Sequence, residues 1–300
     1  QEFLEQVLPR QVGAAGDPAG DQQPFFPSRA VPAPEGLRDP ARQVPEVRDR
    51  SYLISARELV LMSDVGKFRA VSITDLGTYR YEERVDRLHR DIRSLEARKF
   101  IRQHRIMVGG GREKFSVLEL TKQGKKILAQ YQPGQSRQVM YAGIFKLREV
   151  AHDAAVYRMY QVESVEIAKR GGRIARVVLG WELHKSVHSP LSKARPALSP
   201  PEYARHQQQV AVSHGLKFVE GKIPLPDLRI EYETAEGDLA KVDLELATEH
   251  YNGRYAAEKL RAGFKTYADR AHASRLNAAV AHRGGAIDDG PEITAGILSL

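Results

Sequence analysis

The chain has no cysteine and only one tryptophan among 300 residues. The lack of cysteine excludes disulfides, thiolate nucleophiles and cysteine-ligated zinc or iron–sulfur sites, and it fits a reducing compartment such as the cytoplasm. No apolar run approaches the roughly 18 residues of a membrane span. The first residues also lack the basic segment and apolar stretch of a secretory signal, so a protein of the cytoplasm, without membrane spans, is expected.

Nucleotide-binding and zinc signatures are missing as well. The glycines at 109–111 lack the spacing and the following Lys-Ser/Thr of a phosphate-binding loop, so no nucleotide cofactor is expected. His184 and His188 are four residues apart but have no nearby acid to complete a zinc set. Trp181 follows a strand pattern, which predicts core packing or a sheet-edge contact.

Composition allows a packed core and favours an anionic partner. With 42% hydrophobic residues, the length suggests about two domains. The formal net charge is +8 and the isoelectric point is near 9.5, which favours polyanions but is common among proteins that bind none.

The chain divides into three zones by pattern. Residues 1–50 hold eight of the sixteen prolines and almost no periodic apolar pattern, which predicts an arm or linker. Residues 51–135 and 136–300 each carry regular apolar periodicity. The sequence therefore predicts an α+β protein with two domains after the arm, of which the second is an α/β domain.

Within 51–135 the pattern predicts three helices, two strands and a closing helix. The helices begin near Ala56, at Ser72 as an N-cap and near Glu82, and the strands flank a glycine-rich tip at 109–111. In the third helix a stripe of apolar residues at helical spacing predicts a buried face. The residues of this stripe are Val85, Leu88, Ile92 and Leu95.

Basic residues gather around this third helix. Residues 79–105 contain nine Lys or Arg and five acids. Nine minus five gives this segment a net charge of +4, half of the +8 of the whole chain. The arginines that project away from the apolar stripe are Arg84, Arg87, Arg90, Arg93 and Arg98. One interpretation places the helix in the major groove of DNA, with Arg112 and Lys114 of the glycine-rich hairpin on phosphate or in the minor groove. The other is a solvated helix with ion pairs such as Glu83–Arg87 and Asp86–Arg90.

An acidic hairpin is predicted at 223–247. Both arms alternate apolar and polar residues around a turn near Glu236, so Asp227 is expected opposite Glu245, with Asp243 on the same face. Three converging carboxylates suit Mg²⁺ or Mn²⁺, because like charges repel unless a cation lies among them. A hairpin with one solvated face gives the same alternation, so that alternative stays open.

The remaining elements of 136–300 complete an α/β sheet. A helix is expected over 144–168 and a strand over 173–183, followed by a surface loop at 184–205. After the hairpin, a helix over 255–267 and a closing strand at 293–300 are expected.

Two resemblances follow from these motifs. The order of three helices, strand, wing, strand and helix resembles a winged helix-turn-helix. Pro226-Asp227 with Asp243-Leu244-Glu245 resembles the PD-(D/E)XK nuclease motif. Together with His152-Asp153, the combination over residues 52–270 resembles the replication-relaxation family of plasmid and mobile-element proteins.

The nuclease resemblance implies Asp227 and Asp243 as metal ligands, with Glu245 as the third catalytic residue. The motif has a lysine where Glu245 stands, so Lys241 or Lys259 is a candidate substitute. Glu163 or Glu166 is a further candidate ligand. His152 and Asp153 alone are typical of packing or capping.

The expected function is that of a DNA-binding protein of a mobile element whose nuclease-like domain either cleaves DNA with Mg²⁺ or Mn²⁺ or serves as a scaffold. The alternatives are a non-catalytic replication or transcription factor and a protein-docking adaptor. Double-stranded DNA is the expected partner, with a homodimer as one form of the protein, and the charge alone would fit RNA too.

Overall fold

The structure is a computed structural model, and it describes residues 46–47, 50–51, 53–108, 113–131, 137–144, 149–248, 251–281 and 293–295. Most of the predicted arm lies outside these residues. Its last part forms a small antiparallel hairpin of β1 (Glu46–Val47) and β2 (Arg50–Ser51).

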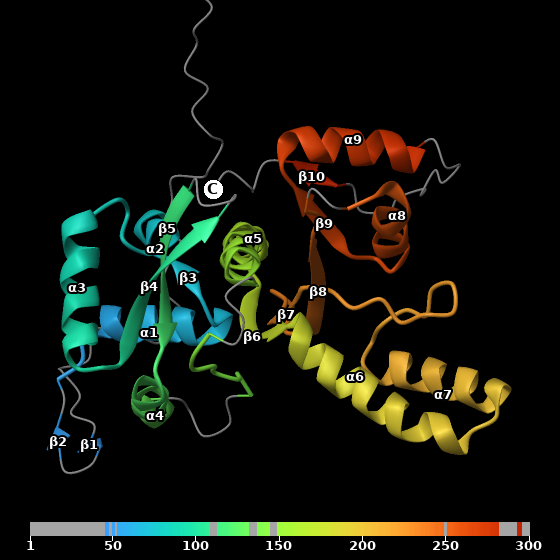
Figure 1. The fold of residues 1–300 in the computed structure, drawn as a ribbon, viewed down its shortest axis with the longest axis horizontal. Helices are drawn as coiled ribbons and strands as arrows, with labels where there is room; N and C mark the ends of the chain where they lie inside the picture. The colour runs from blue at the N-terminus through green and yellow to red at the C-terminus, as the bar shows by residue number, and fades with distance from the viewer. Residues whose placement is uncertain are drawn as a thin grey trace, which may run out of the picture.

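The N-terminal half consists of helices packed on a three-stranded antiparallel sheet with the order β3-β5-β4 (Figure 1). Its elements are α1 (Ala56–Phe68), β3 (Val71–Ser72), α2 (Ile73–Arg80), α3 (Val85–Ala97), β4 (Ile101–Val108), β5 (Glu113–Leu120) and α4 (Lys122–Tyr131). The predicted order of helices and hairpin strands is confirmed, and β3 is an addition.

Local sequence signals explain where these helices begin. Ser55 caps α1 in a capping box with Glu58, and Ser72 accepts a hydrogen bond from the backbone N–H of Asp75 at the start of α2. The predicted stripe of α3 is buried except at Val85, which is 48% exposed. Val85 is the first residue of α3, so its side chain lies beyond the edge of the core.

The C-terminal half is built on a mixed five-stranded sheet with the order β10-β9-β8-β7-β6. Strands β6, β7 and β8 are antiparallel, whereas β8, β9 and β10 are parallel. Its elements are α5 (Val150–Lys169), β6 (Arg173–Leu179), α6 (Gly180–Ala194), α7 (Pro200–Ser213), β7 (Leu228–Glu233), β8 (Leu239–Leu246), α8 (Gly253–Arg261), β9 (Lys265–Ala268), α9 (Arg270–Ala281) and β10 (Thr294–Ala295). The structure is therefore mixed α+β, as predicted at that level.

The prediction of a loop at 184–205 is wrong. Most of this segment forms α6, a short 3₁₀ turn and the start of α7, and the two helices project together from the sheet (Figure 1). Val187, Leu191 and Val210 bury their side chains in a separate apolar cluster with Leu216 and Phe264. The Ser/Pro-rich composition hid this pattern, since Pro190 lies within α6 itself.

The strand predicted to reach 183 ends at Leu179, so Trp181 belongs to α6. Its side chain is 42% exposed and packs edge-on against Tyr141, with ring centroids 5.2 Å apart. The helix predicted over 255–267 ends at Arg261, because Gly263 takes a positive φ and the chain continues as β9.

Helix α5 lies between the two halves and packs on both (Figure 1). The ring of Tyr157 contacts Phe68 of α1 at a centroid distance of 5.1 Å, while Leu228 and Leu244 of the large sheet belong to the same buried cluster. The two predicted domains therefore share one continuous apolar core. None of the helices that the structure describes is long and apolar enough to cross a membrane.

Polar contacts reinforce this junction. Asp64 of α1, which is 2% exposed, accepts hydrogen bonds from Arg80 at 2.5 Å and from the Tyr157 hydroxyl at 3.0 Å. Burial acts to raise the pKa of Asp64, but Arg80, Lys67 and the hydrogen bonds outweigh it and hold that pKa below its usual value. Asp64 is therefore a buried anion with its countercharge beside it.

We expect Asp64→Asn to lower the free energy of unfolding by about 3 kcal/mol, because it leaves the Arg80 guanidinium buried without its counter-ion. Urea denaturation at neutral pH measures this loss. Glu166→Gln is the control, since Glu166 forms an exposed pair with Lys169 and should change stability by less than about 1 kcal/mol. Equal losses in the two variants would show that Asp64 is not the buried counter-ion of Arg80.

Candidate nucleic-acid interface and acidic site

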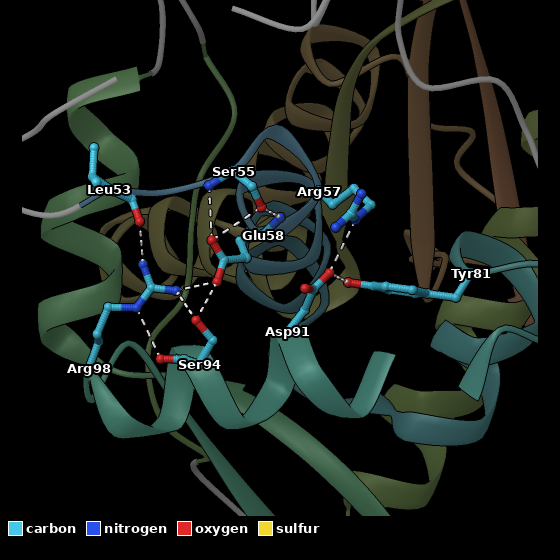
Figure 2. Close-up of polar contacts among 8 residues, drawn as sticks. All are labelled: Leu53, Ser55, Arg57, Glu58, Tyr81, Asp91, Ser94 and Arg98. Carbon is cyan, nitrogen blue, oxygen red and sulfur yellow. Dashed lines mark hydrogen bonds and ion pairs between the residues drawn. The ribbon is translucent and has the colours of Figure 1, made fainter. Parts of the chain in front are cut away.

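The inward polar side chains of α3 fix the helix against α1 (Figure 2). Asp91 accepts hydrogen bonds from the Tyr81 hydroxyl at 2.9 Å and from Arg57 at 3.4 Å. Asp91 is only 6% exposed, and its carboxylate accepts from two donors. It therefore fixes the position of α3 and does not face solvent.

Arg98 belongs to this brace as well, which corrects the prediction that it projects with the other arginines (Figure 2). Its guanidinium pairs with Glu58 and donates to the carbonyl of Leu53 at 2.8 Å. Ser94 donates to Glu58 at 2.7 Å, so this end of α3 is tied to the capping box of α1.

The outward face of α3 keeps its arginines exposed. Arg84, Arg87, Arg90 and Arg93 are all exposed, and only Arg84 has an ion-pair partner among the described residues, Glu82 at 3.6 Å. The two predicted ion pairs, Glu83–Arg87 and Asp86–Arg90, do not form in this described part of the chain. Three cationic side chains therefore extend from a rigidly held helix.

The β4–β5 hairpin lies beside this face. The backbone N–H of Gln103 donates to Glu96 of α3, and two residues further along β4 Arg105 is exposed. Arg105 therefore adds a basic group that the predicted set lacks, and strand alternation from Gln103 could have indicated it. Lys114 lies in β5 opposite Met107, whereas Arg112 lies outside the described residues.

The register of the acidic hairpin confirms part of the predicted cluster. Leu228 pairs with Leu244 and Arg229 with Asp243, so Asp227 lies opposite Glu245 as predicted. The prediction that Asp243 converges with them is corrected. Both oxygens of Asp243 are bound by Arg229, at 2.6 and 2.8 Å, and this bidentate pair occupies the carboxylate.

Asp227 is held at the junction of three elements. Its Oδ2 accepts the backbone N–H of Leu246 at 2.9 Å, and its Oδ1 lies 3.4 Å from Nε2 of His152 at the start of α5. The first residue of α6, Gly180, packs on the backbone here, where a Cβ would come within 2.6 Å of the Pro226 carbonyl oxygen. The carboxylate remains 25% exposed, so a ligand can reach it.

Glu245 is buried beside Asp227 and faces α8. Its Oε1 accepts from the hydroxyl of Tyr251 and lies 2.9 Å from Nζ of Lys259, whereas its buried Oε2 has no hydrogen-bond partner. Burial and then the charge of Asp227 raise the pKa of Glu245 to about 7, although Lys259 and Tyr251 act in the opposite direction.

Lys259 is the lysine that the structure places in this site. Its ammonium also donates to the carbonyl of Leu225 at 2.6 Å, which fixes it between the strand entry and Glu245. The other candidate, Lys241, contacts the carbonyl of Gly215 instead.

His152 joins the site, which corrects its interpretation as a packing or capping residue. Burial acts to lower its pKa, but the nearby carboxylates of Asp153, 4.0 Å away, and Asp227, 3.4 Å away, prevail and raise that pKa to about 10. His152 is therefore a cation at neutral pH, with a side chain 37% exposed.

The acidic site thus holds Asp227, Glu245, Lys259, His152 and Tyr251. No family model and no curated protein matches this chain. The arrangement of its own residues therefore carries the functional argument.

The other candidate ligands lie elsewhere. Glu163 is 1% exposed and binds Lys265 at 2.6 Å and Tyr267 at 2.7 Å, so it ties α5 to β9. Glu166 pairs with Lys169 at 2.7 Å on the surface. Tyr251 was missed by the sequence analysis, since a tyrosine beyond a strand end carries no pattern of its own.

Divalent-metal chemistry has a partial donor set here. In the described part of the chain no three His, Asp or Glu side chains form a group that could hold a metal ion. Asp227 and Glu245 nevertheless present two neighbouring carboxylates, and the unpartnered Oε2 of Glu245 is the kind of oxygen that Mg²⁺ or Mn²⁺ accepts as a ligand. The residues fit a two-carboxylate site that water and a substrate oxygen would complete.

We expect the elevated pKa of Glu245 to make stability fall as pH rises. The folded protein holds this proton up to about pH 7, whereas the unfolded chain releases it near 4.5, so raising the pH favours unfolding across that window. Between pH 5 and 8 the wild type should lose on the order of 2 kcal/mol more than Glu245→Gln.

Urea denaturation at closely spaced pH values measures this difference. Asp238→Asn, in the exposed turn of the same hairpin, is the control and should follow the wild type. A Glu245→Gln profile parallel to the wild type would show that Glu245 is ionised throughout.

Proposed function

We propose that this chain is a DNA-binding protein whose N-terminal half is a winged helix, with α3 as the helix that enters a groove of duplex DNA. The observation that carries the proposal is the outward face of α3. Arg87, Arg90 and Arg93 are exposed and have no ion-pair partner among the described residues, although acids lie close by in the sequence.

The bracing of α3 supports this role. The contacts of Asp91 and Arg98 fix the helix on α1, so the exposed arginines need little further ordering when they meet phosphates. Arg105 of β4 extends the basic surface onto the hairpin, where a winged helix contacts the DNA backbone. Charge and geometry therefore agree on a polyanionic partner.

We expect the triple variant Arg87→Gln, Arg90→Gln and Arg93→Gln to weaken binding to a labelled duplex by roughly tenfold or more, because up to three phosphate contacts are lost. The slope of log K against log salt should become shallower by about 0.9 per lost contact. Fluorescence anisotropy across a salt series measures both.

A matched variant removes three exposed arginines from the C-terminal half, Arg205, Arg254 and Arg270, again to glutamine. It changes the net charge equally and should keep the wild-type slope. If the wild type binds DNA with little salt dependence, or the two variants behave alike, α3 is not the interface, and a protein-docking role for this half becomes the better interpretation.

A second candidate function is metal-dependent phosphodiester hydrolysis at the acidic site. The specific observation is the juxtaposition of Asp227, Glu245 and Lys259, which supplies two carboxylates and one ammonium at a sheet end. A bound Mg²⁺ or Mn²⁺ would supply an activated water and charge neutralisation at the phosphate.

The chain's own residues divide this work. Asp227 and Glu245 would hold the ion. Lys259, fixed by the carbonyl of Leu225, would position the carboxylate and neutralise charge on the attacked phosphate. In this proposal Lys259 takes the place of the motif lysine, and Asp243 is a structural partner of Arg229 and not a ligand.

We expect Asp227→Asn and Glu245→Gln each to abolish cleavage of supercoiled plasmid in Mg²⁺ or Mn²⁺, with EDTA as the metal-free control, while DNA affinity stays within about twofold. Lys241→Gln is the matched lysine control and should leave cleavage unchanged. Calorimetry with Mn²⁺ alone gives a second readout. DNA binding without cleavage and without Mn²⁺ binding would reduce the protein to a non-catalytic DNA-binding factor.

A further inference from the structure

Helix α4 carries a second basic face, whose residues belong neither to the arginine face of α3 nor to the acidic site. Its sequence holds three lysines, Lys122, Lys125 and Lys126, and no acidic residue. Their spacing of three and four residues places them on one side of the helix, and all three are exposed. Among the described residues, none of the three side chains forms an ion pair or a hydrogen bond.

The packing of α4 fixes the direction of this face. The opposite side of the helix buries Ile127 and Leu128, and a Cβ at Gly124 would come within 2.1 Å of the Phe100 carbonyl oxygen. Gly124 therefore allows the helix to lie directly on the backbone that follows α3. With that side held so closely, the three lysines are oriented outward.

Lys99 connects this face to α3. It is exposed and follows Arg98, the C-cap of α3, and its carbonyl accepts a hydrogen bond from the Thr121 hydroxyl at 2.6 Å. Thr121 directly precedes α4, so Lys99 and Lys122 lie next to each other at the C-terminal end of α3. In Figure 1 both helices border the same lower-left part of the molecule.

We propose that this α4 basic face, made of Lys99, Lys122, Lys125 and Lys126, binds the phosphate backbone of the DNA duplex whose groove α3 occupies. The inference rests on the proposed DNA-binding function and extends it from groove contact to a flanking backbone contact. Charge complementarity selects the partner, because closely spaced ammonium groups without counter-ions match the regular negative charges of a duplex.

Lysine suits this contact better than groove recognition. An ammonium acts as a mobile point charge, whereas the planar guanidinium of arginine gives directed bidentate bonds. The arginine face of α3 and the lysine face of α4 are therefore expected to contribute to DNA binding in two different ways. Binding through α4 should be independent of sequence and strongly dependent on salt.

The test compares two triple variants in a salt series with duplexes of about 15 and 30 base pairs. Lys122→Gln, Lys125→Gln and Lys126→Gln removes the α4 charges while keeping good helix propensity. Lys185→Gln, Lys193→Gln and Lys222→Gln removes three exposed lysines from the C-terminal half as the matched control. Circular dichroism and thermal melting verify that both variants fold.

We expect the α4 variant to bind the longer duplex roughly tenfold or more weakly, with a salt slope shallower by about 2 to 3, since each phosphate contact contributes about 0.9. The loss should be equal on duplexes of unrelated sequence. The control variant should match the wild type. An α4 variant that behaves like the control overturns the inference.

Comparison with the α3 variant separates this inference from the proposed function. Loss of binding in the α3 variant alone keeps the proposed function and overturns the α4 contact. Loss in the α4 variant alone keeps a backbone contact by α4 but overturns the proposed role of α3, and with it the placement of that contact beside a groove occupied by α3. Poly-glutamate or single-stranded RNA that competes as well per charge as duplex DNA would show that the face binds another polyanion, and would overturn the assignment to duplex DNA.

Discussion

The burial of helix α5 on two sides is the constraint on which the rest of the structure depends. Its Tyr157 reaches the core of the N-terminal half, and other residues of the same helix cover the large sheet. Asp153 lies 3.7 Å from Arg69, and Arg158 lies 3.2 Å from Asp75, so the polar edge of α5 is tied to the N-terminal half as well. His152 extends from the first turn of this helix to Asp227. One buried helix therefore sets the position of the acidic site relative to the N-terminal half.

Charge balance distinguishes the acidic site from the basic faces of α3 and α4. In the acidic hairpin the three carboxylates of the predicted cluster each have a cation of the chain itself beside them: His152 for Asp227, Arg229 for Asp243 and Lys259 for Glu245. On α3 and α4 the arrangement is the reverse, because several exposed cations have no anion close enough to pair with in the part of the chain that the structure describes. Buried ions need local partners to offset desolvation, whereas exposed cations are stabilised by water until a polyanion replaces it.

The sequence predicted the elements whose signals are local. The pattern beginning at Ala56 located α1, Ser72 as an N-cap located the start of α2, and strand alternation predicted the Asp227–Glu245 register correctly. Prediction from the sequence failed where the composition of a segment conflicts with its packing. The Ser/Pro-rich segment at 184–205 forms two helices because Val187 and Leu191 find a shared apolar cluster, and β9 exists because a neighbouring strand supplies its hydrogen bonds. Both depend on partners distant in sequence.

The sequence by itself determined the order of the elements in the N-terminal half, the basic character of α3 and the alternating faces of the acidic hairpin, since these follow from neighbours within a few residues. Only the tertiary structure decided which charges from separate elements meet. It placed Lys259 beside Glu245, His152 beside Asp227 and Arg98 beside Glu58. Side chains from separate elements become neighbours only when the core packs, and alternation within one hairpin cannot specify which side chains of other helices lie against its face.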